Sequence, residues 1–215
     1  MLEYILLMII AVVVVVGFIV FKVLDRKNKL SHLASNDYNL KDIDITDIDK
    51  MKDGSGFEMY LYRLLIELGY SGVYKTIGSR DFGADVIFTD REGMRNVIQA
   101  KRYSFDKPVG ISAVQEVFSC MRYYKAKKAI VIATAKYTEP CETLAGINHV
   151  KLLDRTDLIN VIDAFRSDDP IVARDIIEGE PRMILESWNE THSGLLQEVR
   201  KDYKAEKYVK KLMGE

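Results

Sequence analysis

The stretch Ser79–Lys101 decides the fold of this chain, and it reads SRDFGADVIFTDREGMRNVIQAK. Two short apolar runs flank a polar turn, a pattern that predicts a β-hairpin. Because side chains of a strand alternate between two faces, Gln99 and Lys101 share one face. A turn centred near Glu92 would place Asp85 opposite Gln99. A carboxylate, an amide oxygen and an ammonium group would then converge, which predicts a metal and phosphate site.

Length and composition describe a globular protein with accessory segments. The 215 residues are 48% hydrophobic and 29% charged, with a formal net charge of −1. A charge so near zero excludes a uniformly basic nucleic-acid-binding protein, so a nucleic-acid surface must be a local patch. The two cysteines, Cys120 and Cys141, have neither the spacing of a zinc site nor that of a disulfide framework. We expect two thiols in a reducing compartment.

The N-terminal segment predicts a membrane anchor. Residues 4–21 contain no charged side chain and would form a helix of roughly 27 Å, enough to cross a bilayer core. A signal peptide would need a basic start and a small-residue cleavage site, and a buried helix would need a polar face. Lys22, Arg26, Lys27 and Lys29 follow the run, so the positive-inside rule puts the remainder in the cytoplasm. We therefore expect a single-pass anchor over residues 1–24.

The rest of the chain divides into three parts. Residues 25–52 are polar and acidic, which favours a linker that ends in a short ordered piece. Residues 53–166 alternate helical and strand patterns, and residues 167–215 form a charged, mostly helical C-terminal segment. Around the hairpin, helices are expected near 57–68, 111–125, 139–146 and 156–165, and strands near 70–76, 129–133 and 149–153. This order predicts an α/β fold with a mixed sheet flanked by helices.

The hairpin carries the groups that phosphodiester hydrolysis needs. Mg²⁺ prefers one or two carboxylates, water and phosphate oxygens, and Asp85 and Gln99 can supply a carboxylate and an amide oxygen. Lys101 can orient or deprotonate a metal-bound water, or hold the phosphate as a point charge. Glu58, from the first helix, can add a second carboxylate. A glutamate at the start of a helix also has a purely structural interpretation, because it favours the helix dipole.

Basic and aromatic residues are interleaved between residues 101 and 137. The basic residues are Lys101, Arg102, Lys107, Arg122, Lys125, Lys127, Lys128 and Lys136, and the aromatic ones are Tyr103, Phe105, Tyr123, Tyr124 and Tyr137. Only Asp106 and Glu116 are acidic up to Lys136. Such a local patch suits a nucleic-acid backbone, although a solvated lysine face would have the same composition.

Five short motifs in order resemble the catalytic domain of Mrr-like restriction endonucleases, within the PD-(D/E)XK nuclease superfamily. They are Phe57-Glu58, Gly83-Ala84-Asp85, Gln99-Ala100-Lys101-Arg102-Tyr103, Val114-Gln115-Glu116 and Leu152-Leu153-Asp154-Arg155. The resemblance implies a restriction-endonuclease-like fold and Mg²⁺- or Mn²⁺-dependent DNA cleavage. It also implies Asp85, Gln99 and Lys101 as the catalytic trio, Glu58 as the helix acid, and Asp85 and Gln99 as metal ligands. Gln99 departs from the usual acid of the superfamily, but glutamine is typical of this branch.

Three functional hypotheses remain open. The first is a membrane-anchored, Mg²⁺-dependent DNA endonuclease that restricts foreign or modified DNA, with Arg102, Gln115, Arg122, Lys125, Lys127 and Lys128 as DNA-binding residues. The second is a non-catalytic, membrane-tethered module that binds DNA or a partner protein. The third is a nuclease for RNA or branched junctions that uses the same site. Cleavage of both strands would favour a homodimer, and no small-molecule cofactor is expected.

Overall fold

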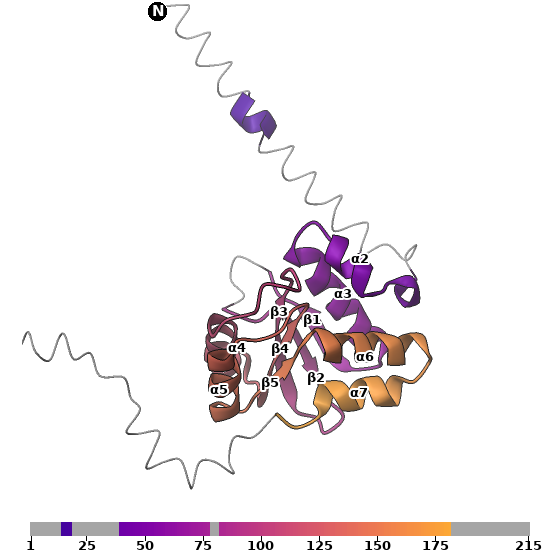
Figure 1. Ribbon diagram of the computed structural model, residues 1–215, viewed down its shortest axis with the longest axis vertical. Helices are drawn as coiled ribbons and strands as arrows, with labels where there is room; N and C mark the ends of the chain where they lie inside the picture. Colours follow the sequence, from indigo (N-terminus) through magenta and orange to yellow (C-terminus); the bar gives the residue numbers. More distant parts are fainter. Residues whose placement is uncertain (1–13, 19–38, 78–81, 182–215) are drawn as a thin grey trace, which may run out of the picture. The chain divides into compact units, whose positions relative to one another are not determined.

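The computed structural model describes residues 14–18, 39–77 and 82–181, and its main body is built on a five-stranded mixed sheet (Figure 1). The strands lie in chain order: β1 (Ser71–Lys75), β2 (Val86–Thr89), β3 (Arg95–Lys101), β4 (Lys128–Ala133) and β5 (Val150–Leu153). The pairs β1–β2 and β2–β3 are antiparallel, whereas the pairs β3–β4 and β4–β5 are parallel. The predicted mixed α/β architecture is confirmed.

The β2–β3 hairpin has the register that the sequence predicts. Thr89 pairs with Arg95, which centres the turn on Glu92. The Asp90 carboxylate accepts hydrogen bonds from two backbone N–H groups of the turn, at 2.8 and 3.0 Å. Gly93 has a φ of +77°, in the left-handed region that glycine adopts without steric cost. Local turn chemistry therefore fixes which residues of β2 and β3 face each other.

Helices cover both faces of the sheet. Helices α4 (Ser112–Tyr124) and α5 (Glu139–Ile147) lie on one face and form the crossovers that parallel strands require. Helices α3 (Gly54–Glu67), α6 (Arg155–Arg166) and α7 (Pro170–Glu178) lie on the other face (Figure 1). The alternating side chains of the strands thus enter two separate cores, with Val97 in one and Ile98 in the other.

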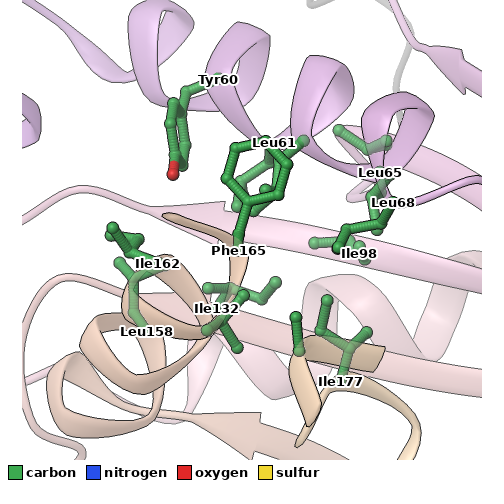
Figure 2. Packing of buried hydrophobic residues seen from close by; sticks show 14 of the residues in the cluster. Tyr60, Leu61, Leu65, Leu68, Ile98, Ile132, Leu158, Ile162, Phe165 and Ile177 are labelled. Atoms are coloured by element: carbon green, nitrogen blue, oxygen red, sulfur yellow. The ribbon is translucent and has the colours of Figure 1, made fainter. Parts of the chain in front are cut away.

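The larger core lies between the sheet and helices α3, α6 and α7. Figure 2 shows aliphatic and aromatic side chains of these helices meeting strand residues from β3 and β4. The labelled members are Tyr60, Leu61, Leu65, Leu68, Ile98, Ile132, Leu158, Ile162, Phe165 and Ile177. Burial of these apolar side chains holds the helical layer on the sheet.

The packed body extends beyond the predicted 53–166 on its N-terminal side. The 3₁₀ helix η1 (Leu40–Asp42) and helix α2 (Ile45–Lys50) bury Leu40 and Ile48 in the larger core. The acidic residues that suggest a linker in the sequence instead cap α2, because Asp44 and Asp47 form a reciprocal capping box. The short ordered piece expected at the end of the segment 25–52 thus consists of η1 and α2.

The packed body also extends on its C-terminal side. Helix α7 buries Ala173 and Ile177 in the same core as α6, so the charged segment predicted from residue 167 begins with a core helix. Residues 182–215 lie outside the described residues.

The predicted anchor is described only in part. Within residues 4–21 the structure describes Val14–Phe18, which are helical. Among the described residues, no helix has the length and apolar character needed to cross a bilayer.

The role of α7 in the core can be tested with two isoleucines of the same helix. Ile177→Ala is expected to lower the free energy of unfolding by about 2–5 kcal/mol, because it removes buried methyl groups and leaves a cavity. Ile171 is 59% exposed, so Ile171→Ala should change it by less than about 0.5 kcal/mol. Equilibrium urea unfolding of the full chain in mild detergent measures both. Equal effects would contradict the assignment of α7 to the core.

Candidate active site

The candidate site lies at the edge of the sheet where β2 begins and β3 ends. Asp85 directly precedes β2 and is hydrogen-bonded through its backbone on both sides. Its N–H donates to the Ile98 carbonyl at 2.7 Å, and its carbonyl accepts from the Thr76 N–H at 2.9 Å. The residue is only 5% exposed. The backbone of β1 and β3 therefore fixes the position of Asp85.

The Asp85 carboxylate joins β2 to β3 through its side chain. Oδ2 accepts a hydrogen bond from Gln99 Nε2 at 2.5 Å and one from the Ala100 N–H at 2.7 Å. A side chain thus accepts a backbone hydrogen bond that a neighbouring strand would otherwise accept. Gln99 is 7% exposed, so two polar groups share a nearly buried position and satisfy each other. The structure brings Asp85 and Gln99 together on one side of the hairpin.

Lys101 ends β3, two residues after Gln99, and pairs with a residue of α4. Its Nζ lies 2.6 Å from Oε2 of Glu116. The lysine side chain is 17% exposed and the glutamate side chain 43%. Gln115, one of the predicted DNA-binding residues, is exposed, and its neighbour Glu116 is the residue that reaches Lys101. The sequence did contain a signal for this contact, because Glu116 is one of only two acidic residues in the basic stretch 101–136.

Gly83 packs the loop before Asp85 against α4. It has a φ of +95°, and a Cβ at this position would lie 2.5 Å from the Glu116 carbonyl oxygen. That distance is a clash with backbone, so only glycine fits here. The loop that carries Asp85 and the helix that carries Glu116 are therefore in direct backbone contact. This backbone contact links the Asp85–Gln99 pair to the Lys101–Glu116 pair.

Glu58 lies in the first turns of α3, and Lys75 at the end of β1 holds it. The Lys75 Nζ to Glu58 Oε2 distance is 2.5 Å, and the side chains are 17% and 21% exposed. Lys75 pairs with Val86, whose side chain enters the core under α3. Glu58 thus sits near the same edge of the sheet as Asp85, on the side that α3 covers, with its charge balanced by Lys75.

Two of the predicted DNA-binding residues make structural contacts. Arg102 donates to the Asp49 carbonyl at 3.2 Å. Lys128 lies 3.2 Å from Asp90 and 3.0 Å from Glu92. Burial opposes the charge of Lys128, but hydrogen bonds to Glu92 and Asp90 outweigh it and raise the lysine pKa. Lys128 therefore stabilises the hairpin turn.

The other predicted basic residues face solvent. Arg122, Lys125 and Lys127 are exposed, and within the described part of the chain no carboxylate forms a salt bridge with them. Lys125 ends α4 in the left-handed conformation, with a φ of 53°. These three cations, close together at the C-terminal end of α4, are available to a polyanion.

The residues at the site fit a hard cation with oxygen ligands. In the described residues, no three histidine, cysteine, aspartate or glutamate side chains gather into a metal-binding cluster. A zinc centre of nitrogen and sulfur ligands would need such a cluster, whereas Mg²⁺ needs only one or two carboxylates and completes its shell with water and phosphate. Asp85 would supply the carboxylate. The Gln99 amide donates a hydrogen bond through Nε2, and its oxygen Oε1 is the second candidate ligand atom.

Comparison with known proteins defines the class of this domain. Residues 48–162 match the family model Mrr_cat, described as restriction endonuclease. The match covers more than half of the 215 residues, and the chain belongs to this restriction endonuclease family. The predicted family is thereby confirmed, and the sheet with its flanking helices is the restriction-endonuclease-like fold of this family. No curated protein sequence matches the chain.

Two solved structures are similar to the chain. The DNA modification-dependent restriction endonuclease AspBHI is 17% identical, with a TM-score of 0.45, over 63% of this chain and 38% of its own. A protein of unknown function, AF1548, is 18% identical, with a TM-score of 0.41, over 47% of this chain and 58% of its own. The matched regions thus span 38% and 58% of those two chains.

A pair of glycine substitutions tests the contact between the Asp85 loop and α4. Gly93→Ala, in the hairpin turn, adds a Cβ in open space. It should lower the free energy of unfolding by only about 1 kcal/mol, the penalty for a left-handed backbone conformation at alanine. Gly83→Ala adds the same penalty and a clash with the Glu116 backbone, so it should cost clearly more. Thermal unfolding of the two variants measures this difference. Equal losses of stability would contradict the backbone contact at Gly83.

Proposed function

We propose that this protein is a Mg²⁺-dependent endodeoxyribonuclease, anchored in the membrane, whose active site is formed by Asp85, Gln99 and Lys101. The observation that carries the proposal is the Asp85 carboxylate, which accepts hydrogen bonds from Gln99 and from the β3 backbone at Ala100. The half-buried Lys101 follows Gln99 by two residues on the same strand. Membership of the restriction endonuclease family supports DNA as the substrate. Restriction of foreign or modified DNA is the corresponding biological role.

Each residue of the proposed site has a distinct task. Asp85 and Gln99 would hold Mg²⁺, which when bound lowers the pKa of a coordinated water and neutralises phosphate charge. The hydrogen bond from Ala100 fixes the carboxylate so that it need not reorganise. Lys101 places its ammonium near the attacked phosphate, where it binds a phosphate oxygen or transfers a proton. Glu116 keeps this ammonium in position before the substrate arrives.

A non-catalytic, membrane-tethered DNA-binding module is the second candidate. The observation that favours it is the single carboxylate beside Gln99, whose amide group donates to that carboxylate. A neutral ligand in place of a second acid leaves more of the metal charge unbalanced. The two candidates differ in whether Asp85 is needed for DNA cleavage or only for the shape of the hairpin.

Cleavage of supercoiled plasmid by the full chain with Mg²⁺ or Mn²⁺ tests the proposed reaction. Asp85→Asn and Lys101→Ala should each lower the cleavage rate at least about 100-fold, the scale of losing one preorganised electrostatic contact. Asp163→Asn removes the same charge at an exposed position of α6 and should leave the rate unchanged. If the Asp85→Asn variant cleaved DNA at the wild-type rate, the proposed catalytic role of Asp85 would be ruled out. Salt-sensitive DNA binding without any cleavage would support the binding module.

The membrane anchor is proposed for residues 4–21, with the nuclease domain in the cytoplasm. The charge-free run and the basic residues that follow it support this proposal. Val13→Arg puts a charge near the middle of the run at a cost of about 2.5–3.5 kcal/mol, so it should move much of the protein out of carbonate-washed membranes. Ile171→Arg, on the exposed side of α7, should not. If the carbonate wash removed the wild-type protein from the membranes, the proposed anchor would be contradicted.

A further inference from the structure

Two aromatic rings face solvent beside the candidate site. Phe82 is 56% exposed and Tyr123 is 65% exposed, and their ring centroids lie 4.5 Å apart. Tyr124 contacts the edge of Tyr123, with centroids 4.9 Å apart and planes at 88°. Large apolar side chains that gather on a surface generally mark a binding site. The rings support one another, so Tyr123 is held in place although most of it is open to solvent.

The backbone at Phe82 keeps its ring in this position. Phe82 has a φ of 50°, which is rare for a bulky residue because it brings Cβ close to the following carbonyl. The next residue, Gly83, packs directly on the Glu116 backbone. The contact of this loop with α4 therefore holds the strained residue, and the Phe82 ring lies against Tyr123 near the end of the same helix.

Both rings are connected to the candidate active site over short distances. Tyr123 follows Glu116 by seven residues, which is two turns of α4 on one face and about 10 Å along the axis. Glu116 contacts Lys101. Phe82 precedes Asp85 by three residues, so the two Cα atoms are at most about 11 Å apart. The Cα atoms of Phe82 and Tyr123 thus lie within about 11 Å of those of Asp85 and Glu116, respectively.

Charge selects the kind of molecule that would cover these rings. Arg122 and Lys125 flank Tyr123 in the sequence, and Lys127 follows closely. All three are exposed and lack a salt bridge to the described residues. Aromatic faces among uncompensated cations are the combination with which proteins bind unpaired nucleotides, because bases stack on the rings while phosphates meet the cations.

We propose that Phe82 and Tyr123 form a stacking platform for an unpaired base of the DNA substrate, within about three nucleotides of the cleaved phosphate. The estimate follows from backbone separations of at most about 11 Å and a rise of about 3.4 Å per nucleotide in a strand. In an intact duplex, neighbouring bases cover both faces of each base, so the platform has little to bind. The substrate class is therefore DNA with a bulged, single-stranded or extruded base near the cut. This inference rests on the proposed nuclease function and narrows its substrate.

Binding of the full-length protein to two labelled DNAs tests the platform. One is a duplex with a bulged 2-aminopurine, and the other is the same duplex fully paired, both without divalent metal so that no cleavage occurs. The wild type should bind the bulged DNA about tenfold more tightly and quench its 2-aminopurine fluorescence. Tyr123→Ala and Phe82→Ala should each remove most of this preference while changing the affinity for paired duplex less than about twofold.

Matched variants separate stacking from other effects. Tyr123→Phe keeps the ring and should keep the preference. Tyr74→Ala removes an aromatic ring that is 41% exposed on β1 and should have no effect. Thermal unfolding checks that all variants fold. An unchanged preference in both alanine variants would overturn the proposal. A dimeric wild type that becomes monomeric in the alanine variants, as measured by light scattering, would also overturn it, because the rings would then join two copies of the chain.

The same preparations distinguish this inference from the proposed function. Plasmid cleavage with Mg²⁺ by the wild type, combined with equal affinity for bulged and paired DNA, would overturn the platform alone. Absence of cleavage, combined with a Tyr123-dependent preference for the bulged DNA, would overturn the nuclease function and leave the platform standing as a DNA-binding surface.

Discussion

The candidate site depends on one hydrogen-bonded carboxylate. Asp85 Oδ2 accepts hydrogen bonds from the Ala100 N–H and from the Gln99 amide, so this side chain joins the start of β2 to β3. A buried carboxylate with such partners is fixed in position, and a buried one without them would be strongly destabilising. The fold and the site therefore have a common requirement. Removing the carboxylate leaves a backbone donor and an amide donor of β3 without their acceptor.

A second contact connects this carboxylate to the helix on the face of the sheet. Gly83 brings the loop before Asp85 into contact with the Glu116 backbone, and the Glu116 side chain holds Lys101. The two halves of the candidate site, the carboxylate and the ammonium, are thus positioned by different elements that meet at one glycine. Movement of α4 would displace the Asp85 loop and the Lys101 partner together.

The sequence predicted what depends on local chemistry. Alternation of side chains and the turn around Glu92 were enough to place Asp85 opposite Gln99, because a hairpin register is set within the segment itself. The partners of Lys101 and Glu58 were not predictable, since Glu116 and Lys75 come from other elements and pair only through the tertiary fold. Where helix α2 lies, the sequence indicated only a short ordered piece at the end of a linker, for a related reason. Acidic residues are typical of linkers, and here they cap a helix only because the apolar side chains between them are buried in the core.

Charge pairing explains why the basic stretch of the sequence is not uniform in role. Basic residues number 31 and acidic residues 32, so most cations can be compensated. Lys128 and Arg102 are held by groups of the hairpin turn and of α2, and they contribute to the architecture. Cations at the end of α4 have no such partners among the described residues. An uncompensated cation gains most when a phosphate arrives, because no existing ion pair must be broken. Under the proposed function, the DNA backbone would run along α4, next to the exposed rings, and its phosphates would approach Lys101.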